Sequence, residues 1–227
     1  MKKLMKAVAT LMLMTAVVYP AESMNAQTHK GHDYVDLGLP SGTLWATCNV
    51  GANKPEEYGD YFAWGETQKK ATYNYDTYKY ANGAKDRLTK YCNKSNSGNN
   101  GFTDNLTVLQ LSDDAATANG GSGWRTPSKA QWEELIDNTT HTWTTRNGVT
   151  GRLFTAKNGN SLFLPAAGYR WVVELYYAGR YGHYWSSSLS TDYPSGAWSL
   201  GFVSGDANVG DGYGRYDGFS VRPVREN

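Results

Sequence analysis

The pattern of hydrophobic and polar positions predicts short strands separated by turns over most of the chain. The segment YVDLGLPSGTLWATCNVG, residues 34 to 51, is typical of two strands joined by a Pro-Ser-Gly turn. The apolar run SLFLP, residues 161 to 165, is typical of a buried strand. Asn147–Gly148 and Asn158–Gly159 each predict a tight hairpin, and the C-terminal FSVRPV predicts a last strand.

The middle of the chain combines long polar loops with a first short helix. Residues 67 to 101 are rich in Lys, Asn, Ser, Gly and Tyr, and they predict long surface loops. In the segment SDDAATANG, Ser112 is the candidate N-cap of a helix and Gly120 is the residue that would end it.

A second helix is marked more clearly by the segment TPSKAQWEELIDN. Ser128 followed three residues later by Gln131 forms the sequence pattern of a capping box. Trp132, Leu135 and Ile136 share one helical face, so we expect this helix to pack on a sheet. Together with the strands, these helices predict an α+β domain.

The first 26 residues have the pattern of a signal peptide. The basic segment MKKLMK precedes an apolar stretch that is too short to span a bilayer, and cleavage is expected after Ala26. We expect residues 27 to 32 to be a flexible new N-terminus and residues 33 to 226 to form one domain. The mature protein would be exported without membrane insertion, to the periplasm, the outer surface or the medium.

Composition limits the chemistry that the chain can carry. The net charge is +1, with acids and bases interspersed, so no basic face for nucleic acid is predicted. Cys48 and Cys92 are the two cysteines, and they could form one disulfide or remain two separate buried thiols. The sequence has no Cys/His cluster and no HExxH motif, so we expect no metal site.

Six motifs along the chain resemble one known family. In chain order they are YVDLGLPSGTLWATCNVGA, YGDYFAWGE, GWRTPSKAQWEEL, LPAAGYR, YWSSS and GFSVRPV. They resemble the Fibrobacter succinogenes major paralogous domain, which is common in exported proteins of Bacteroidetes and covers nearly all of the mature chain. That family is similar to the formylglycine-generating-enzyme branch of the C-type lectin fold. The resemblance implies a C-type lectin-like fold with paired terminal strands, two flanking helices and a ligand-binding face in the final third.

The chain departs from that branch where the enzymes carry their chemistry. Formylglycine-generating enzymes use reactive cysteines late in the domain, but no cysteine follows Cys92 here, so the resemblance does not imply this activity. Ser186, Ser187 and Ser188 lie near His183 in sequence, which alone is no catalytic triad. We expect no catalytic residue and no cofactor. The oxygen-rich segment SGDANVGDG could ligate a structural calcium ion, but it is more typical of a polar loop.

The amino-acid composition of the last segment is typical of a contact surface. Residues 175 to 221 contain no Lys, Glu, Gln or Met, whereas Tyr, Gly, Ser and Asp are frequent. Tyr supplies rigid contact area and Ser, Gly and Asp supply adaptable hydrogen bonds, as in antibody paratopes. The chain also resembles variable proteins of diversity-generating retroelements, in which adenine-directed mutagenesis rewrites codons of the C-terminal portion and excludes Lys, Glu, Gln, Met and Trp from the varied sites. Trp185 and Trp198 lie in this segment, but within the motifs YWSSS and AW, which resemble fixed framework.

We therefore place a candidate variable ligand-binding region at residues 171 to 218. Its candidate ligand-binding residues are Tyr176, Tyr177, Arg180, Tyr181, His183, Ser190, Asp192, Tyr193, Ser199, Asp206, Asn208, Asp211, Tyr213, Tyr216 and Asp217. The expected framework residues are Trp132, Trp185, Trp198 and Phe219.

The sequence thus predicts an exported, non-enzymatic binding protein of the receptor or adhesin type. Its expected ligand is a protein or glycan at a cell or phage surface, and the chain is expected to be a monomer or small oligomer. One alternative is a structural surface subunit that uses the same face on a partner or on itself. Another is a diverged enzyme of the formylglycine-generating branch.

Overall fold

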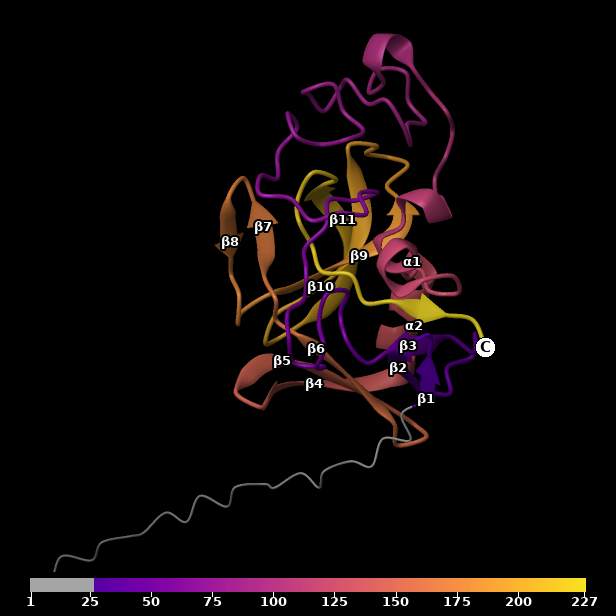
Figure 1. Ribbon diagram of the computed structural model, residues 1–227, viewed down its shortest axis with the longest axis vertical. Helices are drawn as coiled ribbons and strands as arrows, with labels where there is room; N and C mark the ends of the chain where they lie inside the picture. Colours follow the sequence, from indigo (N-terminus) through magenta and orange to yellow (C-terminus); the bar gives the residue numbers. More distant parts are fainter. Residues whose placement is uncertain (1–26) are drawn as a thin grey trace, which may run out of the picture.

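A computed structural model describes residues 27 to 227 as an α+β fold in which strands dominate (Figure 1). The predicted signal peptide, residues 1 to 26, lies outside the described residues. The described part contains four small sheets and two α-helices.

The first sheet brings the N-terminal and C-terminal parts of the chain together. Its strands, in the order β1-β2-β3-β12, are β1 (Gln27–His29), β2 (His32–Asp36), β3 (Leu44–Ala46) and β12 (Val224–Arg225). The prediction of a flexible segment at residues 27 to 32 is wrong, because Gln27 pairs with Tyr34 in an antiparallel hairpin. Lys30 and Gly31 both have positive φ, of 50° and 80°, which is the geometry of a tight hairpin turn.

The second sheet contains the two predicted Asn-Gly hairpins. Its strands, in the order β4-β5-β6, are β4 (Thr139–Arg146), β5 (Val149–Ala156) and β6 (Ser161–Pro165). Asn147 and Gly148 have φ of 47° and 83°, and the residues that flank them pair directly. The buried strand predicted at SLFLP is confirmed, because every residue of β6 is buried. Short-range signals therefore fixed this sheet and its register.

The third sheet and a separate hairpin are built from the last third of the chain. The sheet has the order β11-β10-β9 and consists of β9 (Gly182–Leu189), β10 (Gly196–Phe202) and β11 (Ala207–Gly214). The hairpin consists of β7 (Tyr169–Trp171) and β8 (Glu174–Tyr176), and it projects from one side of the molecule (Figure 1). Backbone hydrogen bonds from Arg170 to Gly218 and from Val172 to Tyr73 attach β7 to the body.

The first helix is capped by a different residue from the one predicted. A 3-10 turn, η2 (Leu111–Asp113), precedes α1 (Ala115–Gly120), and a further turn, η1 (Asn99–Gly101), lies in the long loops. Asp114, not Ser112, is the N-cap, because its carboxylate accepts hydrogen bonds from the backbone of Ala116 and Thr117. Gly120 is the last helical residue, and Gly121 with φ of 84° forms the C-cap.

The capping box predicted for the second helix is confirmed. At the start of α2 (Lys129–Asn138), the Ser128 hydroxyl accepts from the Gln131 backbone and the Gln131 side chain accepts from the Ser128 backbone. The helix packs against β9, β10 and β11 through Trp132 and Leu135, which are both buried, and through Ile136. The expectation that this helix packs on a sheet is therefore confirmed.

Removal of the cap should weaken the whole domain measurably. We expect Ser128→Ala to lower the free energy of unfolding by about 1 kcal/mol, because one backbone donor of the first turn loses its acceptor. Urea denaturation would measure the change. Ser204→Ala in the β10–β11 turn is the control, because Ser204 is exposed, and an equal loss there would contradict this role of the cap.

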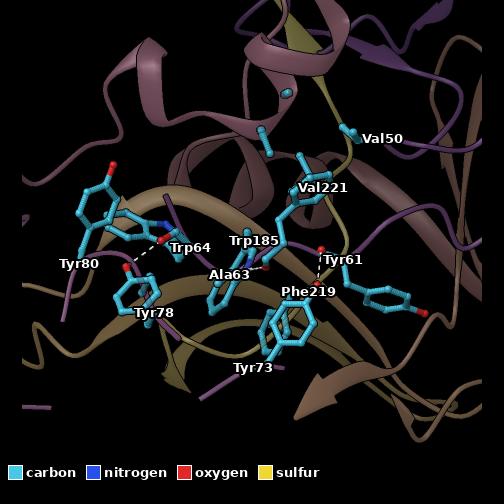
Figure 2. Close-up of a cluster of buried hydrophobic side chains, with 14 of the residues drawn as sticks. Val50, Tyr61, Ala63, Trp64, Tyr73, Tyr78, Tyr80, Trp185, Phe219 and Val221 are labelled. Atoms are coloured by element: carbon cyan, nitrogen blue, oxygen red, sulfur yellow. Dashed lines mark hydrogen bonds between the residues drawn. The ribbon is translucent and has the colours of Figure 1, made fainter. Parts of the chain in front are cut away.

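Two clusters of buried side chains form the core. One surrounds α2 and includes Trp45, Trp132 and Tyr184. The other, shown in Figure 2, centres on Trp185, whose ring stacks on Phe219 with ring centroids 4.1 Å apart. The Trp185 indole donates to the Phe62 carbonyl, which ties β9 to the loop that begins the long polar region.

The long loops are ordered by buried polar contacts to the sheet. Arg215 is fully buried after β11, and its guanidinium donates to the backbone carbonyls of Tyr91 and Lys90. Asp113 accepts from Lys90 and from the Tyr91 hydroxyl. These hydrogen bonds lower the pKa of Asp113 to about 2, although burial of the carboxyl acts in the opposite direction. The loops therefore form a fixed layer of the domain.

The two cysteines are separate free thiols, so no disulfide links Cys48 to Cys92. Cys92 is buried in the long loops, where its Sγ donates to the Lys94 carbonyl and its backbone donates to Asp104. Cys48 follows β3 and lies partly exposed beside Thr47. Of the two alternatives that the sequence left open, the structure has the separate thiols.

Candidate ligand-binding face

Five tyrosines from the β7–β8 hairpin, the loop after it and β11 form one aromatic surface, with one histidine of β9 at its base. We call the rings of Tyr169, Tyr176, Tyr177, Tyr181 and Tyr213, with that of His183, the tyrosine cluster. Tyr169 lies at its centre, with ring centroids 5.8 Å from both Tyr176 and Tyr213 and 6.1 Å from Tyr177. The cluster brings together five of the residues that the sequence singled out.

The outer edge of the cluster is formed by a strained turn. Tyr177 has a φ of 55°, which is uncommon for a residue other than glycine, and its carbonyl accepts from the backbone of Arg180 and Tyr181. This turn stacks the Tyr177 ring on the Tyr181 ring at 4.6 Å. Tyr177 is 47% exposed, Arg180 is exposed and Tyr181 is half-buried. The turn thus presents aromatic side chains to solvent at a fixed position.

His183 belongs to the floor of the cluster and not to its exposed surface. Its ring is buried, 4.6 Å from the Tyr213 ring and 5.3 Å from the Tyr169 ring. Burial lowers the pKa of His183 to about 4, so the imidazole is neutral at pH 7. Its Nδ1 has no hydrogen-bond partner within residues 27 to 227. The sequence placed His183 on the contact surface, which is wrong, because β9 turns this side chain into the sheet packing.

Asp217 is also buried rather than exposed. Burial raises the pKa of its carboxyl to about 7, and a hydrogen bond from the Gly214 backbone opposes this shift. After the effect of burial, the Asp217 charge is the largest cause that raises the pKa of Tyr213 and Tyr216. Asp217 therefore lies close to these two tyrosines, although it cannot be a freely exposed contact residue.

Ser190 and Ser199 are two further predicted contact residues that the structure buries. The Ser190 hydroxyl donates to Asp211 and accepts from the Tyr193 backbone, so it fixes the turn between β9 and β10. The Ser199 hydroxyl donates to the Gly210 carbonyl on the neighbouring strand. Both hydroxyls serve the sheet itself.

The remaining predicted residues form two other groups. Asp192 and Tyr193 are exposed in the β9–β10 turn, with half-buried Asp211 and Tyr216 nearby, and Tyr216 packs on Tyr75 at 4.4 Å. Asp206 and Asn208 are exposed at the β10–β11 turn. There they lie near Arg152, which donates to the Val203 carbonyl. The fifteen predicted residues therefore do not form one continuous site.

Two aromatic residues of this surface were not among the predicted contact residues. Tyr169 was assigned to the motif LPAAGYR, and Trp171 opens the candidate region without having been singled out. Trp171 is 45% exposed and contacts the Tyr176 ring. Alternation along β7 is the signal that could have found them, since residues two apart on a strand share a face.

The framework residues differ in burial. Trp132, Trp185 and Phe219 are at most 1% exposed, as expected of side chains that support a surface. Trp198 is only half-buried, and the Lys129 ammonium lies 3.8 Å from its ring centroid. Its support comes from a charged side chain of α2 and not from the core clusters.

Other parts of the described fold include a small cavity. Within the described range, no three His, Cys, Asp or Glu side chains are placed to hold a metal ion. A cavity of about 190 Å³ lies beside β2, β3 and Pro223, and Cys48, His32 and Trp124 are among its lining residues. The segment SGDANVGDG forms most of β11 and the turn before it.

Comparison with known proteins assigns the chain to no family. No family model, curated protein or solved structure gives a significant match to the chain. None of the helices in residues 27 to 227 has the length and apolar character needed to cross a membrane.

Proposed function

We propose that this protein is an exported, non-enzymatic binding protein of the receptor or adhesin type, and that the tyrosine cluster is its ligand-binding face. The observation that carries this proposal is the gathering of five tyrosine rings, with Trp171 beside them, on one partly exposed surface. Aromatic side chains of this kind dominate binding energy at protein interfaces and have little entropy to lose.

The arrangement of supports around the cluster favours binding without a large conformational change. The ring of Phe219 lies 6.0 Å from Tyr169 and 5.1 Å from Tyr213, so the exposed rings rest on a fully buried side chain. The backbone of Arg170 is hydrogen-bonded to Gly218 on both N–H and C=O. A surface that is held in this way needs little ordering when a ligand docks.

Within this proposal the fold is a C-type lectin-like domain, and residues 171 to 218 are its variable region, rewritten by a retroelement. The expected ligand is a protein or glycan at a cell or phage surface. Sequencing of the 3′ end of the gene in a natural population of its host tests the diversification. Substitutions confined to NNY codons at exposed positions such as Tyr177 and Asp192 would support it, and uniform synonymous variation would refute it.

The binding face itself can be tested with paired tyrosine variants. Residues 27 to 227 would be screened on a glycan array and against a panel of purified bacterial and phage surface proteins. We expect Tyr177→Ala with Tyr181→Ala to weaken any binding found by at least about tenfold, because two stacked, partly exposed rings are lost. Thermal stability should change little, since neither ring is buried.

A matched control separates this face from the neighbouring one. Tyr193 is 46% exposed, almost the same as Tyr177, but it lies in the β9–β10 turn outside the tyrosine cluster. We expect Tyr193→Ala to keep the affinity. Loss of binding in the control with retention in the double variant would move the site away from the tyrosine cluster. A stable oligomer that buries these tyrosines would favour the structural subunit instead.

A further inference from the structure

The segment that carries most of the tyrosine cluster has unbalanced charges. Residues 171 to 217 contain five acidic side chains and two basic ones, although the whole chain has a net charge of +1. One of the two bases, Arg215, is fully buried and donates to carbonyls of the long loops. Arg180 is then the single exposed base of this segment.

None of those five acids forms an ion pair within the described chain, although Asp206 lies near Arg152. The ion pairs of the structure all involve acidic residues outside residues 171 to 217. Glu174 lies directly opposite Trp171 in the β7–β8 hairpin, so it shares the face of Trp171, and it is exposed. Asp217 is 5% exposed, its backbone N–H donates to the carbonyl of Gly214, which directly follows Tyr213, and the next residue, Gly218, is hydrogen-bonded to Arg170 of β7. A buried carboxylate without a counter-charge is costly to keep in a fold.

The protein's own cations cover aromatic rings elsewhere but not here. Lys and Arg side chains lie over the rings of several loop residues, among them Tyr73, Tyr78, Tyr80 and Tyr91. The other such contacts also fall on rings outside the tyrosine cluster. Within the described residues, no Lys or Arg side chain therefore lies over a ring of the tyrosine cluster.

These observations agree on the kind of ligand group that would fit. The faces of aromatic rings carry negative electrostatic potential and attract ammonium and guanidinium groups. An ionised carboxylate close to the rings adds to this attraction, because the low local dielectric weakens its screening. We propose that the tyrosine cluster binds a lysine or arginine side chain of a partner protein and that Asp217 selects for its positive charge. This inference rests on the proposed function, since it names the chemistry of the ligand for the same face.

Small probes that differ only in charge can test this inference on the mature chain, residues 27 to 227. Acetyl-arginine amide carries the cation, and acetyl-citrulline amide has nearly the same shape without the charge. NMR titration of the tyrosine ring signals at pH 8, at which the Asp217 carboxyl is ionised, measures both affinities. We expect the arginine probe to bind at least about tenfold more tightly than the citrulline probe.

Two Asp→Asn variants locate the charge that selects the cation. We expect Asp217→Asn to remove most of the preference for the arginine probe, and Asp192→Asn, which changes an exposed acid in the β9–β10 turn, to keep it. A thermal melt at pH 5 checks that Asp217→Asn is folded. Tyr177→Ala with Tyr181→Ala should weaken both probes, because both would rest on the same rings.

Several results would overturn the inference while leaving the binding face intact. These are equal binding of the two probes, no binding of the arginine probe, an unchanged preference in Asp217→Asn, or tighter binding of methyl glucoside than of the arginine probe. The last result would point to a glycan ligand. The proposed function itself fails only if a macromolecular ligand is found and the Tyr177 and Tyr181 double variant retains it, so the two failures are distinguishable.

Discussion

Trp132→Ala should lower the free energy of unfolding by about 3–5 kcal/mol, which is a large part of the stability of a typical domain. The side chain has no exposed surface and packs on the ring of Trp45, with ring centroids 4.8 Å apart. Its indole N–H also donates to the Trp185 carbonyl at 3.1 Å. Truncation would therefore leave a cavity between α2 and the sheet, together with a buried carbonyl that lacks its donor.

Urea denaturation followed by far-ultraviolet circular dichroism would measure this loss. Trp171→Ala is the matched control, because Trp171 is 45% exposed on the β7–β8 hairpin. We expect that control to lose less than about 1 kcal/mol, as surface substitutions usually do. A similar loss in both variants would contradict the packing of α2, and Trp132→Phe should recover much of the loss by filling the same space.

The parts of the fold that the sequence predicted depend on neighbours in the chain. An Asn-Gly pair readily adopts the two positive φ angles of a two-residue hairpin turn, as Asn147 and Gly148 do. The capping box of Ser128 and Gln131 uses donors and acceptors three residues apart. Such signals need no knowledge of the tertiary structure, and they were correct.

Which side of a strand faces inward was harder to predict in the last third of the chain. The pairing of β10 with both neighbours shifts register between Ala197 and Ser199, and such a bulge changes which residues share a face. Asp217 lies in a turn, where no alternation exists to be read. Asp217 is buried where the chain packs on a distant segment, because the next residue, Gly218, is hydrogen-bonded to Arg170 of β7. A composition typical of a contact surface therefore identified the region but not which of its side chains are exposed.

Tyr169 is the reverse case, because it belongs to the aromatic surface although the sequence did not single it out. Its sequence motif belongs to the strand that precedes the candidate region, and sequence alone gave no reason to separate it from the framework. In the structure its ring touches those of Tyr176, Tyr177, His183 and Tyr213. Contacts between β7, the following loop and β11 exist only after the sheet has formed, so local pattern could not show them.

Asp217→Asn should make the protein more stable than the unmodified chain at pH 8, with a difference that shrinks toward pH 4. Burial raises the pKa of the Asp217 carboxyl to about 7 in the folded state, against an ordinary value near 3.8. Between those two values the unfolded chain has released a proton that the folded chain still holds. The free energy of unfolding therefore falls as pH rises through this window, by at most about 4 kcal/mol for a shift of about three pH units.

Urea denaturation of both proteins at pH 4.5, 6 and 8 would measure this difference. Because asparagine cannot ionise, the variant does not lose free energy of unfolding through this group as pH rises. The lowered pKa of His183 acts in the opposite direction, but His183 is present in both proteins and its contribution cancels in the difference. Asp192→Asn is the control, because that carboxyl is exposed in the β9–β10 turn. A flat difference for Asp217→Asn would mean that its carboxyl is hydrated or paired. The stability difference could instead rise with pH while the same variant loses binding of the arginine probe. That result would show that the Asp217 charge destabilises the fold and serves the binding face.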